Sequence, residues 1–165
     1  MKKYIAIIAL VASTCLSQAG DSKSAVAFVD SITVAPVAAL KTAGLNGQST
    51  FGAGLDLGVG VNKFVSIHVT GLAYETDNWR SSTIDESEAY VSADLTKFAK
   101  DSFIVSIKGG AVADWNDGDY GLAVGAGARL QLLKSLSIGS DYSVRAWLAK
   151  REKDSLARLF VAYKF

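Results

Sequence analysis

His68 is the only histidine in the chain, and Ser66 and Thr70 lie two residues away on either side of it. A histidine beside a serine can accept the hydroxyl proton and convert that serine into a nucleophile. The same residues can also form a hydrogen-bonded group that only fills the interior of a sheet protein. We expect this second, structural role for His68.

The segment "DWNDGDYG", Asp114 to Gly121, is acidic enough to suggest a calcium site. Its spacing does not follow the Asp-x-Asp-x-Asp-Gly pattern of a calcium loop. Asp117-Gly118, in contrast, is a strong signal for a hairpin turn. We therefore expect a solvated turn here, and we expect the protein to use neither a metal ion nor a cofactor.

A third set of residues with chemical potential consists of charged side chains within otherwise apolar or glycine-rich segments. Its members are Asp56, Asp94, Lys108, Arg129, Asp141, Arg145 and Arg158. Acids and bases are roughly matched, as a charged interior requires, because an unpaired buried charge is expensive. The set could line a path for ions or form a lumen charge network of ion pairs, and we expect the network.

The elements that must position these residues are β-strands. From about Ile32 onward, apolar residues alternate with small or charged ones, and a period of two is typical of strands with two different faces. In "TFGAGLDLGVGV", for example, glycines and Asp56 oppose a purely apolar face. The predicted strands span residues 31–42, 50–61, 65–75, 88–96, 103–114, 119–132, 135–148 and 155–165.

Short and long connections alternate between these strands. The short ones lie near 62–64, 96–102 and 133–134, and the longer or more polar ones lie at 43–49, 76–87, 115–119 and 150–154. This alternation predicts an all-β fold, an eight-stranded antiparallel up-and-down barrel with one tight end and one solvated end. Pro36, the only proline, must then lie at a bulge or where the strand needs no backbone donor.

The apolar face of such a barrel can point inward around a ligand or outward to lipid. Glycines crowd the polar face, although glycine in the centre of a strand costs stability on an ordinary surface. Eight strands enclose an interior just wide enough for side chains, so small residues must alternate there with long charged ones. We therefore predict a transmembrane barrel whose apolar face points outward.

The first twenty residues have the pattern of a secretory leader. A basic start precedes an apolar run, and "SQA" at 17–19 predicts cleavage after Ala19. We expect residues 1–19 to be a signal peptide and residues 20–165 to be one barrel domain. The only cysteine, Cys15, lies in the leader, and its lipidation is the alternative. Without the two leader lysines the formal charge is −1, which gives no electrostatic case for nucleic-acid binding.

Aromatic residues gather near the predicted strand ends, as in the interface belts of membrane barrels. One belt, at the end with the long loops, would contain Trp79, Trp115, Trp147, Tyr74 and Tyr120. The other would contain Phe64, Phe98, Phe103, Tyr163 and Phe165. This distribution favours the membrane orientation.

The chain resembles the small eight-stranded outer-membrane barrels of Gram-negative bacteria, of the OmpA-transmembrane-domain and OmpX type. The resemblance covers essentially the whole chain after the leader and rests on pattern rather than on an internal motif. Its most specific part is the last strand, because such proteins typically finish on an aromatic residue preceded by apolar ones at alternate positions. Leu159, Val161, Tyr163 and Phe165 fit this assembly signal, and the resemblance implies that the barrel-assembly machinery binds it.

The same resemblance implies the cell outer membrane as the location, with lipid and lipopolysaccharide as neighbours. We expect a structural or surface-interaction role without enzymatic activity, in which the loops, mainly 76–87, contact other cells, host factors, phage or lipopolysaccharide. A small porin-like ion channel is the alternative, and a lipid A-modifying enzyme is a further one. The deacylases among these barrels have a His-x-Ser-Asn-type motif, and "HVTGL" at 68–72 has neither its serine nor its asparagine.

Overall fold

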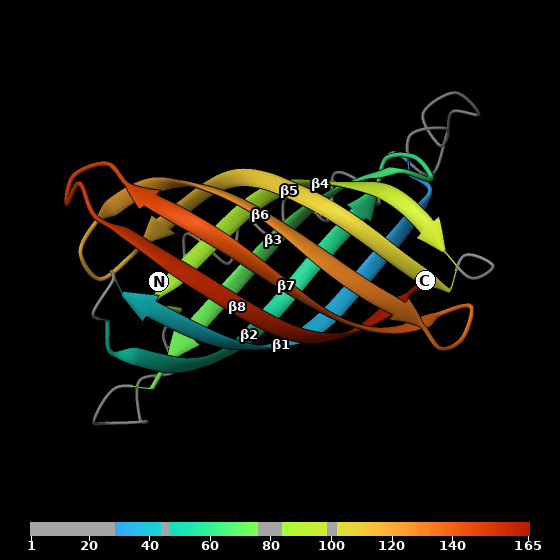
Figure 1. Cartoon of the computed structure of the whole chain (residues 1–165), viewed down its shortest axis with the longest axis horizontal. Helices are drawn as coiled ribbons and strands as arrows, with labels where there is room; N and C mark the ends of the chain where they lie inside the picture. The colour runs from blue at the N-terminus through green and yellow to red at the C-terminus, as the bar shows by residue number, and fades with distance from the viewer. Residues whose placement is uncertain (1–28, 44–46, 76–83, 99–101) are drawn as a thin grey trace, which may run out of the picture.

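The protein is a closed, all-antiparallel barrel of eight strands, each hydrogen-bonded to its neighbours in chain order (Figure 1). The computed structural model describes residues 29–43, 47–75, 84–98 and 102–165. The strands are β1 Ser31–Ala43, β2 Ser49–Gly60, β3 Val65–Tyr74, β4 Glu86–Phe98, β5 Phe103–Asp114, β6 Asp119–Gln131, β7 Leu136–Trp147 and β8 Lys153–Lys164. The predicted fold class is confirmed. The expected signal peptide, with Cys15, lies outside the described residues.

The residues that alternate along the sequence lie alternately on the outer surface and in the interior of the barrel. In β6, Leu122 and Val124 are 61% and 65% exposed on the outer surface, whereas Ala123 between them is 3% exposed. In β2, Asp56 is buried between two exposed leucines, Leu55 and Leu57. Successive side chains of a strand point to opposite faces, so the closed sheet turns the apolar face outward and the small and charged face inward.

The two ends of the barrel differ in their connections. The turn end, on the right in Figure 1, carries the turns at 61–64 and 132–135 and the C-terminal Phe165. The loop end, on the left, carries the connections at 115–118 and 148–152. Within the described parts of the chain, no helix is long and apolar enough to cross a membrane.

Pairing of the first and last strands closes the barrel. Val34 lies opposite Tyr163 and Val37 opposite Phe160 in one register, and no pair forms at Pro36 between them. The register is the same on both sides of Pro36, so there is no bulge at this position. Pro36 instead lies at a gap in the hydrogen bonds between β1 and β8, where a backbone N–H is not needed.

Two strands extend further toward the loop end than the alternation predicted. β4 begins at Glu86 rather than at residue 88, and β8 begins at Lys153 rather than at 155. The expected loops at 76–87 and 150–154 are correspondingly shorter. This difference matters because it moves Glu86 and Asp154 from solvated loops into the barrel wall, with both side chains buried.

The barrel interior contains little apolar packing. One small cluster of buried apolar residues consists of Val37, Ala39, Leu72 and Leu156, and another consists of Val112, Ala123 and Trp147. The buried polar and charged side chains of the interior are the candidates for function.

Candidate functional site

Arg145 is the centre of a group of ion pairs near the loop end. Its Nε and Nη2 donate to the two carboxylate oxygens of Asp154 at 2.6 and 2.8 Å, and its Nη1 donates to Glu86 at 2.6 Å. Lys41 also pairs with Glu86 and lies 3.7 Å from Asp154. We call Lys41, Glu86, Arg145 and Asp154 the loop-end cluster; it links side chains of β1, β4, β7 and β8.

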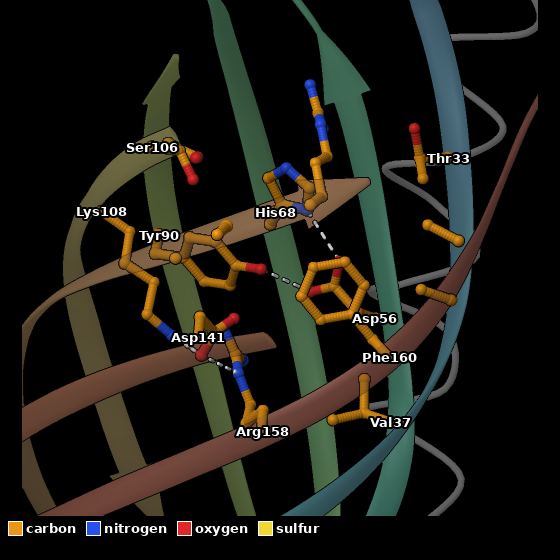
Figure 2. Close-up of a pocket in the computed structure, with 16 residues that line it drawn as sticks. Thr33, Val37, Asp56, His68, Tyr90, Ser106, Lys108, Asp141, Arg158 and Phe160 are labelled. Carbon is orange, nitrogen blue, oxygen red and sulfur yellow. Dashed lines mark hydrogen bonds and ion pairs between the residues drawn. The ribbon is translucent and has the colours of Figure 1, made fainter. Parts of the chain in front are cut away.

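A second group fills the middle of the barrel. Arg158 makes a two-pronged pair with Asp141, 2.9 Å for each nitrogen–oxygen contact, and also donates to Glu88 at 3.0 Å. Lys108 donates to the same Asp141 at 2.7 Å. Figure 2 shows Lys108 and Arg158 converging on this carboxylate. We call Glu88, Lys108, Asp141 and Arg158 the central cluster.

Next to the central cluster, Asp56 binds His68, and His68 binds Ser66. Asp56 Oδ2 is 2.7 Å from His68 Nδ1, and His68 Nε2 is 2.8 Å from the hydroxyl of Ser66. The other Asp56 oxygen accepts hydrogen bonds from Thr70 and, at 3.0 Å, from Tyr90. We call the three linked residues Asp56, His68 and Ser66 the Asp56–His68–Ser66 chain. Figure 2 shows His68 and Tyr90 both directed at Asp56.

The imidazole of His68 is held on both faces. The ring of Tyr90 stacks on it at 4.8 Å between centroids, with 5° between the planes. On the neighbouring strand, Gly58 pairs with His68, and a Cβ there would come within 2.6 Å of the ring. Position 58 is therefore a close approach that only glycine allows without a shift.

Thr70 connects this chain to the central cluster. Its hydroxyl donates to Asp56 and accepts a hydrogen bond from Arg158 at 3.0 Å. Thr70 therefore bridges the Arg158 guanidinium and the Asp56 carboxylate through one hydroxyl group.

A cavity enters the barrel from the turn end. It has a volume of about 150 Å³, and its lining includes Ser66, His68 and Arg129. A smaller cavity of about 50 Å³ adjoins it, since His68 and Arg129 line both, and its lining also includes Asp56 and residues of the central cluster. Arg129 is held at the mouth by Asp94 at 2.7 Å. The cavities thus lead from the turn end to the central cluster.

The acidic segment at the loop end forms a turn. Gly118 has a φ of 68°, the left-handed conformation that a hairpin turn requires of glycine, and Asp114 accepts hydrogen bonds from the backbone of Asn116 and Asp117. Lys150, in the connection between β7 and β8, binds Asp117 and Asp114 in the neighbouring loop. The hydrogen bond to Asp117 raises the pKa of Lys150, so this lysine stays charged.

The structure distributes the residues of the expected lumen charge network over these groups. Lys108, Asp141 and Arg158 belong to the central cluster, Asp56 lies beside it, Arg145 belongs to the loop-end cluster, and Arg129 pairs with Asp94 near the turn end. Sequence reasoning missed Lys41, Glu86, Glu88 and Asp154. Glu88 could have been found, because it lies two residues from Tyr90 and six from Asp94 on the same face of one strand.

The expected aromatic belt at the loop end is wrong for two of its members. Trp147 is 6% exposed and donates its indole N–H to Asp154 at 2.9 Å inside the barrel. Tyr74 also points inward, where its hydroxyl donates to Glu86 and its ring faces Lys41. Their polar atoms find partners in the loop-end cluster, which a lipid-facing position would not offer.

The other belt residues that the structure describes lie on the outer surface. These are Trp115 and Tyr120 near the loop end and Phe64, Phe103, Tyr163 and Phe165 near the turn end. The rings of Tyr163 and Phe165 also contact each other edge to face, 4.8 Å between centroids. Trp79 and the side chain of Phe98 lie outside the described part of the chain.

Among the described residues, no group of three or more histidine, cysteine, aspartate or glutamate side chains is arranged to hold a metal ion. Most buried acids are matched by a lysine or arginine instead. Glu88 Oε1 and the hydroxyl of Ser143 are buried atoms without a hydrogen-bond partner in this part of the chain. Ion pairs and hydrogen bonds dominate this described part of the interior.

An eight-stranded barrel with an apolar outer surface and a charged interior has the fold of the small outer-membrane β-barrels. No protein-family model matches the sequence. No curated protein matches it either.

Solved structures do match. The chain is similar to Neisserial surface protein A, with a TM-score of 0.62, 15% identity, and coverage of 81% of this chain and 97% of that one. It is similar to the N-terminal β-barrel domain of Pseudomonas aeruginosa OprF, with a TM-score of 0.57, 13% identity, and coverage of 81% and 97%. A de novo designed transmembrane β-barrel matches with a TM-score of 0.54, 15% identity, and coverage of 82% and 95%. At these identities the likeness establishes the shared fold.

Proposed function

We propose that the chain is an integral outer-membrane barrel with a structural or surface-interaction role and a lumen closed by ion pairs. The observation that carries this proposal is the inverted distribution of side chains. Arg145 and Arg158 are 1% and 2% exposed, whereas Leu159, beside Arg158 in the same strand, is 65% exposed. A barrel in water would gain by the opposite arrangement, since burying a large apolar side chain stabilises by about 1.5–3 kcal/mol.

The outward apolar residues form a continuous surface rather than isolated positions. They come from all eight strands and include Leu40, Leu55, Ile67, Val91, Ile107, Val124, Val144 and Leu159. Apolar patches of this extent on a soluble monomer mark contact with a membrane or a partner. The exposed aromatic residues at both ends support the membrane as that environment.

The location is tested by the behaviour of the folded protein on gels and in fractionated cells. An outer-membrane barrel stays folded in SDS until it is heated, so the unheated sample should migrate differently from the boiled one. The protein should also sediment with the outer membrane of a Gram-negative host. A water-soluble protein with no heat-dependent shift would overturn the proposal and favour a soluble barrel.

The closed lumen is proposed from the central cluster. Lys108 and Arg158 reach Asp141 from β5 and β8, and Arg158 also reaches Glu88 on β4. Eight strands leave no wide channel around such a group. Purified barrel in a planar lipid bilayer should therefore show no steady single-channel conductance. Regular openings that Arg129→Ala or Asp56→Ala removes would favour the porin-like channel instead.

The partners are part of the same proposal. The connections at 115–118 and 148–152 would face the cell exterior and contact lipopolysaccharide or a surface ligand there; the expected contact segment at 76–83 lies outside the described residues. Binding of lipopolysaccharide to the purified barrel should then weaken when Lys150, in the 148–152 connection, and Lys153, at the start of β8, are replaced by glutamine. Unchanged binding would show that lipopolysaccharide does not contact this part of the loop end.

A further inference from the structure

The Asp56–His68–Ser66 chain has the connectivity of an orienting carboxylate, a general base and a nucleophile. The two contacts, 2.7 Å from Asp56 to His68 and 2.8 Å from His68 to Ser66, are both short enough for proton transfer. We propose that these three residues form an acyl-transfer site that hydrolyses small esters inside the barrel.

The surroundings of His68 fix the imidazole in the orientation that this role needs. Asp56 is itself held by Thr70 and Tyr90, and the ring lies between Tyr90 and the bare backbone of Gly58. In the tautomer whose Nδ1–H donates to Asp56, Nε2 is the acceptor for the hydroxyl proton of Ser66. A base positioned in advance pays no cost of reorientation during the reaction.

Asp56 is less exposed to solvent than His68 and Ser66, as a catalytic role for these three residues requires. The side chains of Asp56 and His68 are 8% and 12% exposed, and Ser66 is half-buried. Ser66 and His68 both line the cavity of about 150 Å³ that enters from the turn end. The orienting acid is therefore shielded from solvent, while the nucleophile faces a cavity that small molecules can enter.

The reaction follows from these positions. Ser66 Oγ forms a bond to the ester carbonyl carbon while His68 Nε2 takes the hydroxyl proton. The bond to the alcohol oxygen then breaks, and the leaving alcohol takes that proton from His68. Water attacks the acyl-Ser66 in the same way, which releases the carboxylic acid and restores the serine. No external oxidant or reductant is needed.

The cavity limits the substrate to small, water-soluble esters of short-chain acids. Its volume is too small for a lipid with several acyl chains, and it opens at the turn end rather than through the lipid-facing surface. Arg129 and Lys134 line the same cavity, and Arg129 is paired there with Asp94.

This inference goes beyond the proposed structural role and is independent of it. From the sequence we expected no enzymatic activity, because "HVTGL" matches no motif of the lipid-modifying barrels. The contact between His68 and Asp56, on two different strands, is what the motif comparison could not show.

The test is the reaction of the folded, detergent-solubilised barrel with diisopropyl fluorophosphate, followed by peptide mass spectrometry. A serine activated by a base forms a bond to phosphorus and displaces fluoride, whereas ordinary serines react very slowly. We expect the adduct on Ser66. Its rate of formation should fall about 100-fold or more in His68→Gln, and also in Asp56→Asn, which serves if His68→Gln does not fold. Hydrolysis of 4-nitrophenyl acetate should be lost in Ser66→Ala.

The matched control is Ser143→Ala, which removes a buried serine from another part of the interior. This variant should keep both the labelling and the hydrolysis. Each variant is first shown to keep the heat-dependent shift of a folded barrel. No adduct on Ser66 in folded protein, or an equal rate in His68→Gln, would overturn the proposal. Labelling without ester turnover would overturn its assignment as a hydrolase.

Discussion

Arg145 and Asp154 lie directly opposite each other on β7 and β8, and they form a two-pronged ion pair inside the barrel. The same guanidinium reaches Glu86 on β4, which does not pair with either strand in the sheet. The interior ion pairs therefore connect strands that backbone hydrogen bonds do not connect. In a barrel with little apolar core, such links replace the side-chain packing that holds a soluble protein together.

Replacing Arg145 should strongly destabilise the barrel. Arg145→Met keeps most of the side-chain volume but leaves Glu86 and Asp154 with Lys41 as their single counter-charge among the described residues. Removing one partner of a buried ion pair typically costs about 3–5 kcal/mol. The free energy of unfolding, from urea titration of the barrel in lipid vesicles, should fall by an amount in this range.

The matched control for this change is Arg129→Met. Among the described residues Arg129 has one ion-pair partner, Asp94, and the two side chains are 35% and 10% exposed, so this pair is partly open to solvent. Solvent weakens such a pair, so this variant should lose less stability than Arg145→Met. Equal losses in the two variants would mean that burial does not set the strength of these pairs.

Ser143→Ala should be neutral or slightly stabilising. Ser143 is completely buried, and its hydroxyl has no hydrogen-bond partner among the described residues. Removing an unsatisfied polar group relieves its desolvation penalty. Thr70→Val is the contrasting change, because Thr70 is equally buried but bonds to both Asp56 and Arg158. It should lower the free energy of unfolding by about 1–3 kcal/mol. A larger loss in Ser143→Ala than in Thr70→Val would contradict this account.

Gly58→Ala should disturb the interior even though it adds a single methyl group. The new Cβ would lie 2.6 Å from Cε1 and 2.7 Å from Nδ1 of His68, and hydrogen bonds to Asp56 and Ser66 restrain the ring. Overpacking of this kind costs about 1–3 kcal/mol. A shift of the His68 resonances in the NMR spectrum should accompany the lower urea midpoint.

Gly109→Ala provides the control for Gly58→Ala. Gly109 also lies within a strand, but it is exposed, and a Cβ there would have its nearest neighbour at 3.9 Å. Surface substitutions of this kind change stability by about 0.5 kcal/mol or less. If Gly109→Ala destabilised as much as Gly58→Ala, the loss would reflect strand glycines in general rather than the contact with His68.

The sequence predicted the architecture well because one physical signal, the period-two alternation, runs through nearly every strand. It failed where polar residues occupy both faces. In "IDESEAY" and "KREKD" the alternation disappears, so Glu86 and Asp154 were placed in loops although both lie in the barrel wall. Trp147 was assigned to a belt by its position at a strand end, whereas its alternation with Ala146 placed it on the inward face, where it lies.

The side-chain contacts between strands could not be predicted from the sequence, for a different reason. The alternation predicts that Asp56 and His68 both point into the barrel, but it does not predict which residues of the two neighbouring strands lie opposite each other. In the structure Asp56 pairs with Thr70 and His68 with Gly58, which makes Asp56 and His68 diagonal neighbours. That register depends on the turn at 61–64, where Asn62 accepts hydrogen bonds from the backbone of Phe64 and Val65.

The C-terminal Phe165 should be needed for assembly more than for stability. The residue is 73% exposed, so it adds little to the packing of the barrel, while its backbone N–H donates to the backbone oxygen of Ile32 at 2.9 Å. Deletion of Phe165 should reduce insertion into the outer membrane far more than deletion of one residue from the 76–83 segment, as measured by the heat-shifted fraction in isolated membranes. Phe165→Ser, which keeps the backbone bond and removes only the ring, should be as defective as the deletion. If Phe165→Ser assembled normally, or if both deletions assembled equally well, the terminal aromatic ring would not be the assembly signal.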